Sequence, residues 1–325
     1  MSEKFPFIDV IVVNYNGKEV LGNFLASLSK IDYPKNKIHC ILVDNASTDG
    51  SVDFVRKKYA NVKIVMNKKN LGYVGINSAL RYCRGKYAYI ANNDLILHKG
   101  CFKKFMDVME KDSSIAMTTY VSMNYFDPKI VSGGTWVSRS MYCGHYARDK
   151  NKKITEIPYM GGGFIRKSVI DKFGYIFDPD YFIYAEDLDL GLRIRSIGMK
   201  VVMVGGAINY HMHAFTTKKW EVPSKSVFLL ERNLLMTFFK IFEIKTVLIM
   251  LPYVAFMRAA SILRDLIALK FRNAFARLKA ILWVILNFRL VLKKRREVQR
   301  LRKADDKYIL KIFSEKYLLK KPVIV

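Results

Sequence analysis

Four short apolar runs recur in the N-terminal third of the chain, and they constrain the fold more than any other sequence feature. They cover residues 7–13, 38–43, 62–66 and 87–91. Their hydrophobic residues alternate little with polar ones, which is typical of strands buried on both faces. Helical patterns separate the runs and include residues 20–28, 51–59 and 73–83. The sequence therefore predicts an α/β fold with a mainly parallel sheet flanked by helices.

Polar residues follow each apolar run where the predicted strand ends. Parallel strands share one direction, so these ends meet at one edge of the sheet, where open α/β sheets bind ligands. The run 87–91 continues into two amides and a carboxylate, oxygen ligands that suit Mg²⁺ or Mn²⁺ beside a nucleotide diphosphate. Taken alone, this triplet fits an Asn-rich turn better. The candidate binding residues at these ends are Asn14, Asn16, Asp44, Asn70, Asn92, Asn93 and Asp94, together with Gly72.

Three carboxylates stand within four residues at the start of a later predicted helix, at Glu186, Asp187 and Asp189. Acidic residues in a first turn favour the helix dipole, which is the structural explanation. Three acids exceed what a helix cap needs. At helical spacing, Glu186 and Asp189 share one face, and Asp187 points about 100° away from Glu186.

The region between these segments is harder to interpret. The glycines at 161–163 permit close approach of the backbone to a ligand, or they form a simple flexible turn. The stretch 132–136, which ends at Trp136, favours a loop or a hairpin.

The formal net charge is +27, and more than half of the excess lies in residues 222–325. Apolar, helix-patterned stretches there contain dispersed Lys and Arg. The longest uncharged run, 246–257, is shorter than the ~20 residues that span a bilayer. We therefore predict an amphipathic, basic helical tail that associates with an anionic membrane surface. An ordinary helical subdomain with a solvated basic face is the alternative.

Other features limit the partners and the compartment. Basic character also suits nucleic acid, but the sequence has no recognisable nucleic-acid motif, so no such partner is expected. The N-terminus lacks the basic start and apolar segment of a signal peptide. Four scattered cysteines indicate neither a disulfide framework nor a zinc site. The prediction is a peripheral protein on the cytoplasmic face of the cell membrane, without a transmembrane helix.

Seven short motifs occur in an order and spacing that resemble the family 2 glycosyltransferases, particularly their rhamnosyltransferase-like branch. Each motif alone is weak, but together they cover about residues 7–215. The motifs are 12–16 (VVNYN), 43–51 (VDNASTDGS), 70–72 (NLG), 92–94 (NND), 161–164 (GGGF), 184–190 (YAEDLDL) and His211.

The resemblance implies a GT-A fold, in which a Rossmann-like nucleotide-binding half joins an acceptor-binding half. We expect a catalytic domain at 1–221, with halves 1–98 and 99–221, followed by the helical tail at 222–325. In this scheme the polar residues at the strand ends bind the nucleotide sugar. Acceptor binding is expected at Gly161, Gly162, Gly163 and Trp136.

Individual roles follow from the same resemblance. Asp44 would bind the base of the nucleotide, and Asp94 the metal or the ribose. His211 matches a late histidine that completes the metal site or contacts the diphosphate. The expected cofactor is a divalent cation, Mg²⁺ or Mn²⁺. The family often has Asp where this chain has Asn92, whose amide oxygen can bind a metal but brings no charge.

The resemblance also implies an inverting sugar transfer. Asp187 matches the catalytic base that takes the proton from the acceptor hydroxyl, and Glu186 beside it would raise its pKa. The donor is expected to be a nucleoside-diphosphate sugar, and the branch suggests deoxythymidine-diphosphate rhamnose. The acceptor is expected to be a lipid-linked glycan or a cell-surface polysaccharide. A nucleotidyltransferase or a basic nucleic-acid-binding protein remains the alternative.

Overall fold

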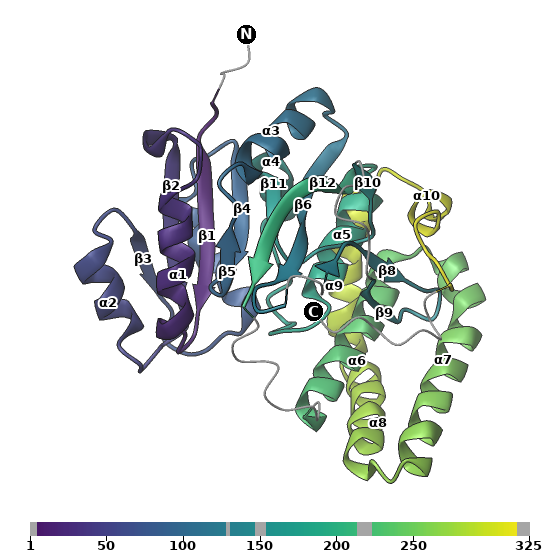
Figure 1. Cartoon of the computed structure of the whole chain (residues 1–325). Helices are drawn as coiled ribbons and strands as arrows, with labels where there is room; N and C mark the ends of the chain where they lie inside the picture. Colours follow the sequence, from purple (N-terminus) through teal and green to yellow (C-terminus); the bar gives the residue numbers. More distant parts are fainter. Residues whose placement is uncertain (1–4, 128–130, 147–153, 213–222, 317–325) are drawn as a thin grey trace.

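A computed structural model describes residues 5–127, 131–146, 154–212 and 223–316 of the chain. Among these residues, ten strands form one sheet with helices packed around it (Figure 1). The sheet order is β10-β12-β6-β11-β4-β1-β2-β3, with β5 beside β12 and β7 beside β6. The strands of this sheet are β1 (Ile8–Asn14), β2 (Ile38–Asp44), β3 (Lys63–Met66), β4 (Tyr87–Asn92), β5 (Leu95–Leu97), β6 (Ile115–Asn124), β7 (Val131–Ser132), β10 (Thr155–Glu156), β11 (Gly163–Arg166) and β12 (Lys200–His211).

The N-terminal half of the sheet confirms the predicted parallel arrangement. β1 pairs in parallel with β2 on one side and with β4 on the other. The register sets Asn14 opposite Asp44, and Val13 opposite Asn92. The polar ends of these strands therefore meet at one edge, as the apolar runs predicted.

The other half of the sheet is mixed. β11 runs antiparallel to both β4 and β6, whereas β6 and β12 are parallel to each other. β12 continues through a register shift between Met203 and Ile208, where Gly206 has a positive φ of 79°. Its last residue, His211, pairs with Leu95 of β5. This pairing brings His211 next to Asp94.

Helices cover the sheet and form the C-terminal part of the chain. The helix predicted at 73–83 is a 3₁₀ segment, η2 (Tyr73–Tyr82), rather than an α-helix. The side chains of Asn77 and Ser78 in it bond to Phe177 and Asn67 outside it. The other helical segments are α1 (Lys18–Ser29), η1 (Lys35–Lys37), α2 (Ser51–Lys58), α3 (Cys101–Lys111), α4 (Lys167–Phe173), α5 (Glu186–Ser196), α6 (Ser224–Ile241), α7 (Ile244–Ile267), α8 (Phe271–Leu286), α9 (Phe288–Leu301) and α10 (Asp306–Leu310).

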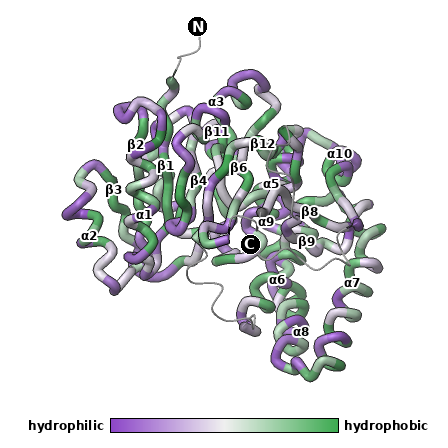
Figure 2. The backbone as a smooth tube through the Cα atoms, viewed as in Figure 1, coloured by the Kyte–Doolittle hydropathy of each residue, from purple (hydrophilic) through white to green (hydrophobic). Residues whose placement is uncertain are grey.

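The C-terminal helices differ from the predicted surface tail. α6 packs on α5, α8 and α9, and residues of α6 to α10 belong to the same hydrophobic core as the sheet. Among the described elements, α7 and α8 reach farthest from the sheet, as a hairpin (Figure 1). Along both helices, hydrophobic and hydrophilic stretches alternate (Figure 2). The predicted boundary between residues 221 and 222 lies outside the described residues.

Candidate active site

A cavity of about 680 Å³ opens at the carboxyl edge of the sheet. Its volume falls in the range of small-molecule sites. Its walls come from the ends of β1 and β4, the start of η2, the first turn of α5 and the end of β12. The sequence-predicted residues that line it are Asn70, Gly72, Asn92, Asn93, Asp94, Gly161, Gly162, Glu186, Asp187 and His211.

The remaining nucleotide-binding candidates lie beside the cavity rather than in its lining. Asn14 is fully buried and links two strand ends: its Nδ2 donates to Asp44 Oδ1 at 3.1 Å, and its Oδ1 accepts from Asn93 at 2.8 Å. Asp44 also accepts hydrogen bonds from the backbone N–H and hydroxyl of Ser47 at 2.9 and 2.6 Å. Asn16 accepts from the N–H of Thr48 at 2.8 Å. In the structure these three side chains hold the loop after β2 in place.

A second polar network fixes the start of η2. Asn45, which sequence reasoning did not single out, lines the cavity and donates to the carbonyl of Gly72 at 2.8 Å. Asn70 accepts from the N–H of Gly72 at 2.8 Å. Gly72 has a positive φ of 67°, and a Cβ there would stand 2.2 Å from the carbonyl oxygen of Phe182. Glycine is therefore required for this close approach to the segment before α5.

His211 lies between the two predicted metal-site residues of β4 and its turn. Its Nδ1 is 3.3 Å from Asp94 Oδ2, and its Nε2 is 3.3 Å from Asn92 Nδ2. Burial, and then the nearby His145, lower the pKa of His211 to about 4. The imidazole is therefore neutral at neutral pH, and its contact with Asp94 is not an ion pair.

The donor set suits a divalent cation only together with a ligand. Among the described residues, no three His, Cys, Asp or Glu side chains form a metal-binding group. Asp94, His211 and the Asn92 amide supply a partial set, so diphosphate oxygens and water would have to complete it. No Lys or Arg stands among the described residues that line the cavity. A bound diphosphate would therefore depend on a metal for charge neutralisation there.

The acidic first turn of α5 brings two of its three carboxylates into the cavity. Burial, and then the charge of Asp187, raise the pKa of Glu186 well above its usual range. Burial also raises the pKa of Asp187 to about 6, although its Oδ1 accepts the N–H of Leu188 at 2.8 Å. Asp187 is thus ionised at neutral pH and basic enough to accept a proton from a substrate hydroxyl. Asp189 points away and pairs with Arg193 at 2.8 Å.

The glycine-rich segment forms the wall opposite α5. A Cβ on Gly161 would lie 3.6 Å from Asp187 Oδ2, so the absence of a side chain leaves space beside that carboxylate. Gly162 also lines the cavity. Gly163 does not, because it begins β11, where a Cβ would stand 2.1 Å from the carbonyl oxygen of Thr118. Two of the three predicted acceptor-binding glycines therefore face the site.

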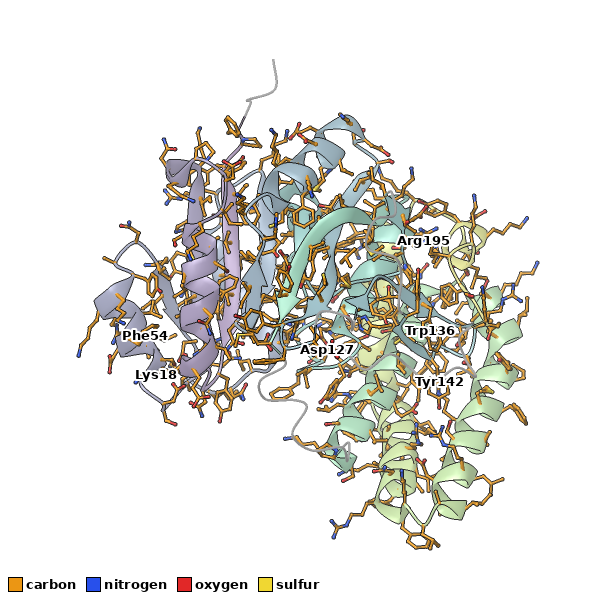
Figure 3. All side chains as sticks on the ribbon, in the orientation of Figure 1. Lys18, Phe54, Asp127, Trp136, Tyr142 and Arg195 are labelled. Atoms are coloured by element: carbon orange, nitrogen blue, oxygen red, sulfur yellow. The ribbon has the colours of Figure 1, made fainter. Side chains whose placement is uncertain are left out.

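Trp136 does not reach the cavity lining. It lies in a separate hairpin of β8 (Thr135–Val137) and β9 (Cys143–His145), where it pairs with Gly144 and is 7% exposed (Figure 3). Its indole packs over Gly144, and the neighbouring His145 faces the cavity instead. His145 Nδ1 is 3.0 Å from Ser132 Oγ, which also lines the cavity.

Three of the five tyrosines that line the cavity lie outside the motifs and were missed by sequence reasoning: Tyr73, Tyr120 and Tyr159. The hydroxyl of Tyr73 donates to the carbonyl of Gly161 at 2.8 Å and so joins η2 to the glycine-rich wall. Burial raises the pKa of Tyr73 well above its ordinary value, which keeps its hydroxyl protonated. Its position directly after Gly72 was an available signal. Tyr120 of β6 and Tyr159, in the segment between β10 and β11, gave no local signal, because only the folded chain brings them to the site.

Known proteins resemble this chain in sequence. The N-acetylglucosaminyl-diphospho-decaprenol L-rhamnosyltransferase of Mycobacterium tuberculosis is 26% identical over 254 residues. The matched part covers 67% of this chain and 78% of the relative.

Solved structures resemble it in fold. The mannosyltransferase PcManGT from Pyrobaculum calidifontis, in complex with GDP-Man and Mn²⁺, matches with a TM-score of 0.56 and 18% identity, over 98% of this chain and 88% of its own. GalNAc-T7 with UDP, GalNAc and Mn²⁺ matches with a TM-score of 0.57 and 17% identity, over 68% of this chain and 46% of its own. These likenesses show the GT-A fold.

The decisive comparison is with protein families. Residues 9–174, just over half of the chain, match the family described as Glycosyl transferase family 2. That range contains β1, β2 and β4 with their polar ends, and also the glycine-rich wall. The protein therefore belongs to glycosyl transferase family 2 and is a glycosyltransferase.

Proposed function

We propose that the protein is an inverting glycosyltransferase that moves a sugar from a nucleoside-diphosphate sugar to an acceptor hydroxyl. One observation carries the proposal: Asp94 and Asp187, from distant parts of the chain, line the same cavity. Residues 1–98 would hold the nucleotide, and 99–221 the acceptor. Asp44, with its loop, is the proposed support of the nucleotide base.

The two carboxyl groups at the start of α5 have different roles in the proposed reaction. Asp187 takes the proton of the acceptor hydroxyl while that oxygen attacks the anomeric carbon. The bond from the anomeric carbon to the diphosphate oxygen breaks at the same time, and the diphosphate leaves from the opposite face of the sugar. Burial, and then the charge of Asp187, raise the pKa of Glu186 and so favour its protonated form, which brings no negative charge beside the base. No covalent intermediate is needed.

A divalent cation, Mg²⁺ or Mn²⁺, fits the other end of the site. Asp94, His211 and the amide oxygen of Asn92 would hold it. When bound, it would neutralise the charge of the departing diphosphate. The absence of Lys and Arg from the described lining makes this requirement strong.

Deoxythymidine-diphosphate rhamnose is the proposed donor, and a lipid-linked glycan or cell-surface polysaccharide is the proposed acceptor. The support is the Mycobacterium tuberculosis relative, whose name describes rhamnosyl transfer to a diphospho-decaprenol acceptor. A lipid-linked acceptor requires access to a membrane. We propose a peripheral location on the cytoplasmic face, where anionic lipids attract the basic C-terminal helices.

The test compares wild type with Asp187→Asn, using Asp107→Asn on the exposed face of α3 as the matched control. Purified protein, donor and acceptor are incubated with Mn²⁺, and the glycosylated product and free nucleoside diphosphate are quantified. Asp187→Asn should lose at least about a hundredfold in turnover, the usual contribution of a general base. The control should match wild type. Undiminished turnover in Asp187→Asn, with an unchanged melting temperature, would remove Asp187 from the proposed role.

A further inference from the structure

The C-terminal half of α7 buries polar side chains and exposes apolar ones, whereas the buried residues of its N-terminal half, Val247, Met250 and Val254, are apolar. Among the side chains that it turns toward the protein are Arg258, Ser261 and Asp265, all buried. Its outward side chains include Ile249, Phe256, Leu263 and Ile267, which are 57–74% exposed. Soluble helices place apolar residues inside and polar residues outside. The reversed arrangement is the pattern of a helix whose outer surroundings are apolar.

The buried polar residues of α7 have partners from neighbouring elements. Arg258 lies 3.3 Å from Glu231 of α6, and Asp265 is 2.7 Å from Arg277 of α8. Tyr142 lies in the loop between β8 and β9 (Figure 3), and its hydroxyl bonds to both Glu231 and Ser261. The inner face of α7 is therefore already occupied by this chain, and only its outer face is left to contact something else.

The α8 helix continues the same arrangement. Its buried positions are small or medium-sized: Ala274, Ala276, Ala280 and Val284. Its large apolar side chains point outward, and Phe275, Leu282 and Leu286 are 68%, 54% and 73% exposed. Small residues between helices and large ones on the outside are typical of helices packed in lipid.

The exposed hydrophobic residues of the molecule concentrate on this hairpin. Of the 22 large hydrophobic side chains that are exposed in the described part of the chain, 16 lie between Ile244 and Phe288. A contiguous apolar surface of this kind marks an interaction site.

The charges around this surface identify the occupant. Glu243, just before α7, is exposed and acidic, but the exposed charged residues from 244 to 289 are all basic: Lys245, Arg264, Lys270, Arg272, Lys279 and Arg289. A second copy of the chain would bring the same positive charges against them. An anionic lipid surface offers hydrocarbon for the apolar side chains and negative headgroups for the basic ones.

We propose that the α7–α8 hairpin is the membrane-docking element, and that its outer face enters the boundary between headgroups and acyl chains of an anionic bilayer. The proposal deepens the proposed function, since it rests on a lipid-linked acceptor. α7 is also the one described helix long and apolar enough to cross a membrane. However, the C-terminal half of its inner face, Arg258, Ser261 and Asp265, is polar and covered by protein, and Lys270 and Arg272 stand at the hairpin turn. The hairpin therefore lies in the interface rather than across the bilayer.

The experiment uses the full chain and flotation with vesicles of phosphatidylcholine, with or without phosphatidylglycerol. The test variant combines Phe256→Ser, Leu263→Ser and Leu282→Ser. The matched control combines Met66→Ser, Phe126→Ser and Ile154→Ser, which are similarly exposed but lie elsewhere. The test variant should bind anionic vesicles at least about tenfold more weakly than wild type, whereas the control should bind like wild type. All proteins are first compared by melting temperature.

A second variant measures how deeply the hairpin enters the bilayer, and it keeps a hydrophobic side chain at the substituted position. Phe256→Trp should show a blue-shifted fluorescence that lipids brominated near the headgroup end of the acyl chain quench more than lipids brominated at the chain terminus. Stronger quenching by the lipids brominated at the chain terminus would overturn the interfacial placement. Equal vesicle binding by the test variant and wild type would overturn the docking role. So would a wild-type dimer in sedimentation that the test variant converts to a monomer.

Sugar transfer to a short, water-soluble acceptor separates this inference from the proposed function. A variant that no longer binds vesicles but still glycosylates the soluble acceptor supports both. If no protein transferred sugar, while wild type and the control bound vesicles and the test variant did not, the proposed donor and acceptor would be contradicted and the docking element supported.

Discussion

At Asp187, burial determines the pH range in which the site can work. Its pKa is raised to about 6, so the carboxylate becomes protonated, and useless as a base, as the pH falls below that value. We expect kcat/KM to be level above about pH 7 and to fall tenfold per pH unit well below 6. The measurement is a pH–rate profile between pH 4.5 and 8 (about the range set by this pKa). The exposed control Asp107→Asn should keep the profile, and a rate independent of pH below 6 would contradict the assignment.

Asp94 and His211 should contribute differently to cation binding, because one side chain is charged and the other is neutral. Asp94→Asn removes the single negative charge of the proposed metal set, whereas His211→Ala removes a neutral donor. Both substitutions should weaken the Mn²⁺-dependent thermal stabilisation of the protein by nucleoside diphosphates. For Asp94→Asn, the apparent affinity for the nucleoside diphosphate should be at least about tenfold lower than for wild type. His98→Ala, at an exposed histidine, is the control. Equal stabilisation of wild type with and without Mn²⁺ would show that the cation is dispensable for binding.

At the level of elements, Gly72 and Gly174 make a matched pair. Both have positive φ, 67° and 78°, but a Cβ at Gly72 meets the Phe182 carbonyl at 2.2 Å, whereas Gly174 has nothing within 4 Å. Gly174→Ala should cost about 1 kcal/mol of unfolding free energy, from the backbone alone. Gly72→Ala should cost about 3 kcal/mol and raise the KM for the donor, because η2 and the segment before α5 must separate. Denaturant unfolding and kinetics check this, and equal costs for the two variants would contradict it.

The sequence predicted those elements whose hydrophobic pattern reflects their own burial. β1, β2 and β4 are continuous apolar runs because both faces of each strand are covered, and their polar ends meet by parallel register. The β8–β9 hairpin is short and gains its place from contacts with distant segments, so Trp136 was predicted in the lining and His145 was not. η2 was predicted as a helix without its 3₁₀ type, since its apolar spacing does not distinguish the two helix types.

At the level of the whole molecule, the C-terminal region shows why an amphipathic pattern is ambiguous. An apolar helix face has the same sequence pattern whether it contacts lipid or the core of its own chain. α6 meets the core, and α7 exposes its apolar face. The basic residues are equally ambiguous in sequence, because Lys240 and Lys294 are buried and paired, whereas Lys270 and Arg272 are exposed.

Buried ion pairs join the C-terminal helices to the catalytic helix. Lys240 of α6 lies 2.8 Å from Asp178 and 2.5 Å from Asp189 of α5, and Lys294 of α9 is 2.5 Å from Asp178. Burial alone would raise the pKa of Asp178, but the charges of Lys240 and Lys294 outweigh it and hold that pKa below its ordinary value. The pairs therefore stabilise the fold above the ordinary pKa of an aspartate, and this contribution is lost as the pH falls through the lowered one.

Lys240→Met tests whether the helical region is an integral part of the catalytic unit. The substitution leaves Asp178 and Asp189 buried with fewer partners, so it should lower the free energy of unfolding by about 3–5 kcal/mol at neutral pH. Arg56→Met breaks an exposed pair with Asp53 and should cost less than about 1 kcal/mol. Urea unfolding measures both. Because α5 carries Asp187, the destabilised variant should also lose sugar transfer before it unfolds globally. A Lys240→Met protein as stable as Arg56→Met would mean that α6 is a dispensable attachment and that the catalytic helix is held by the sheet alone.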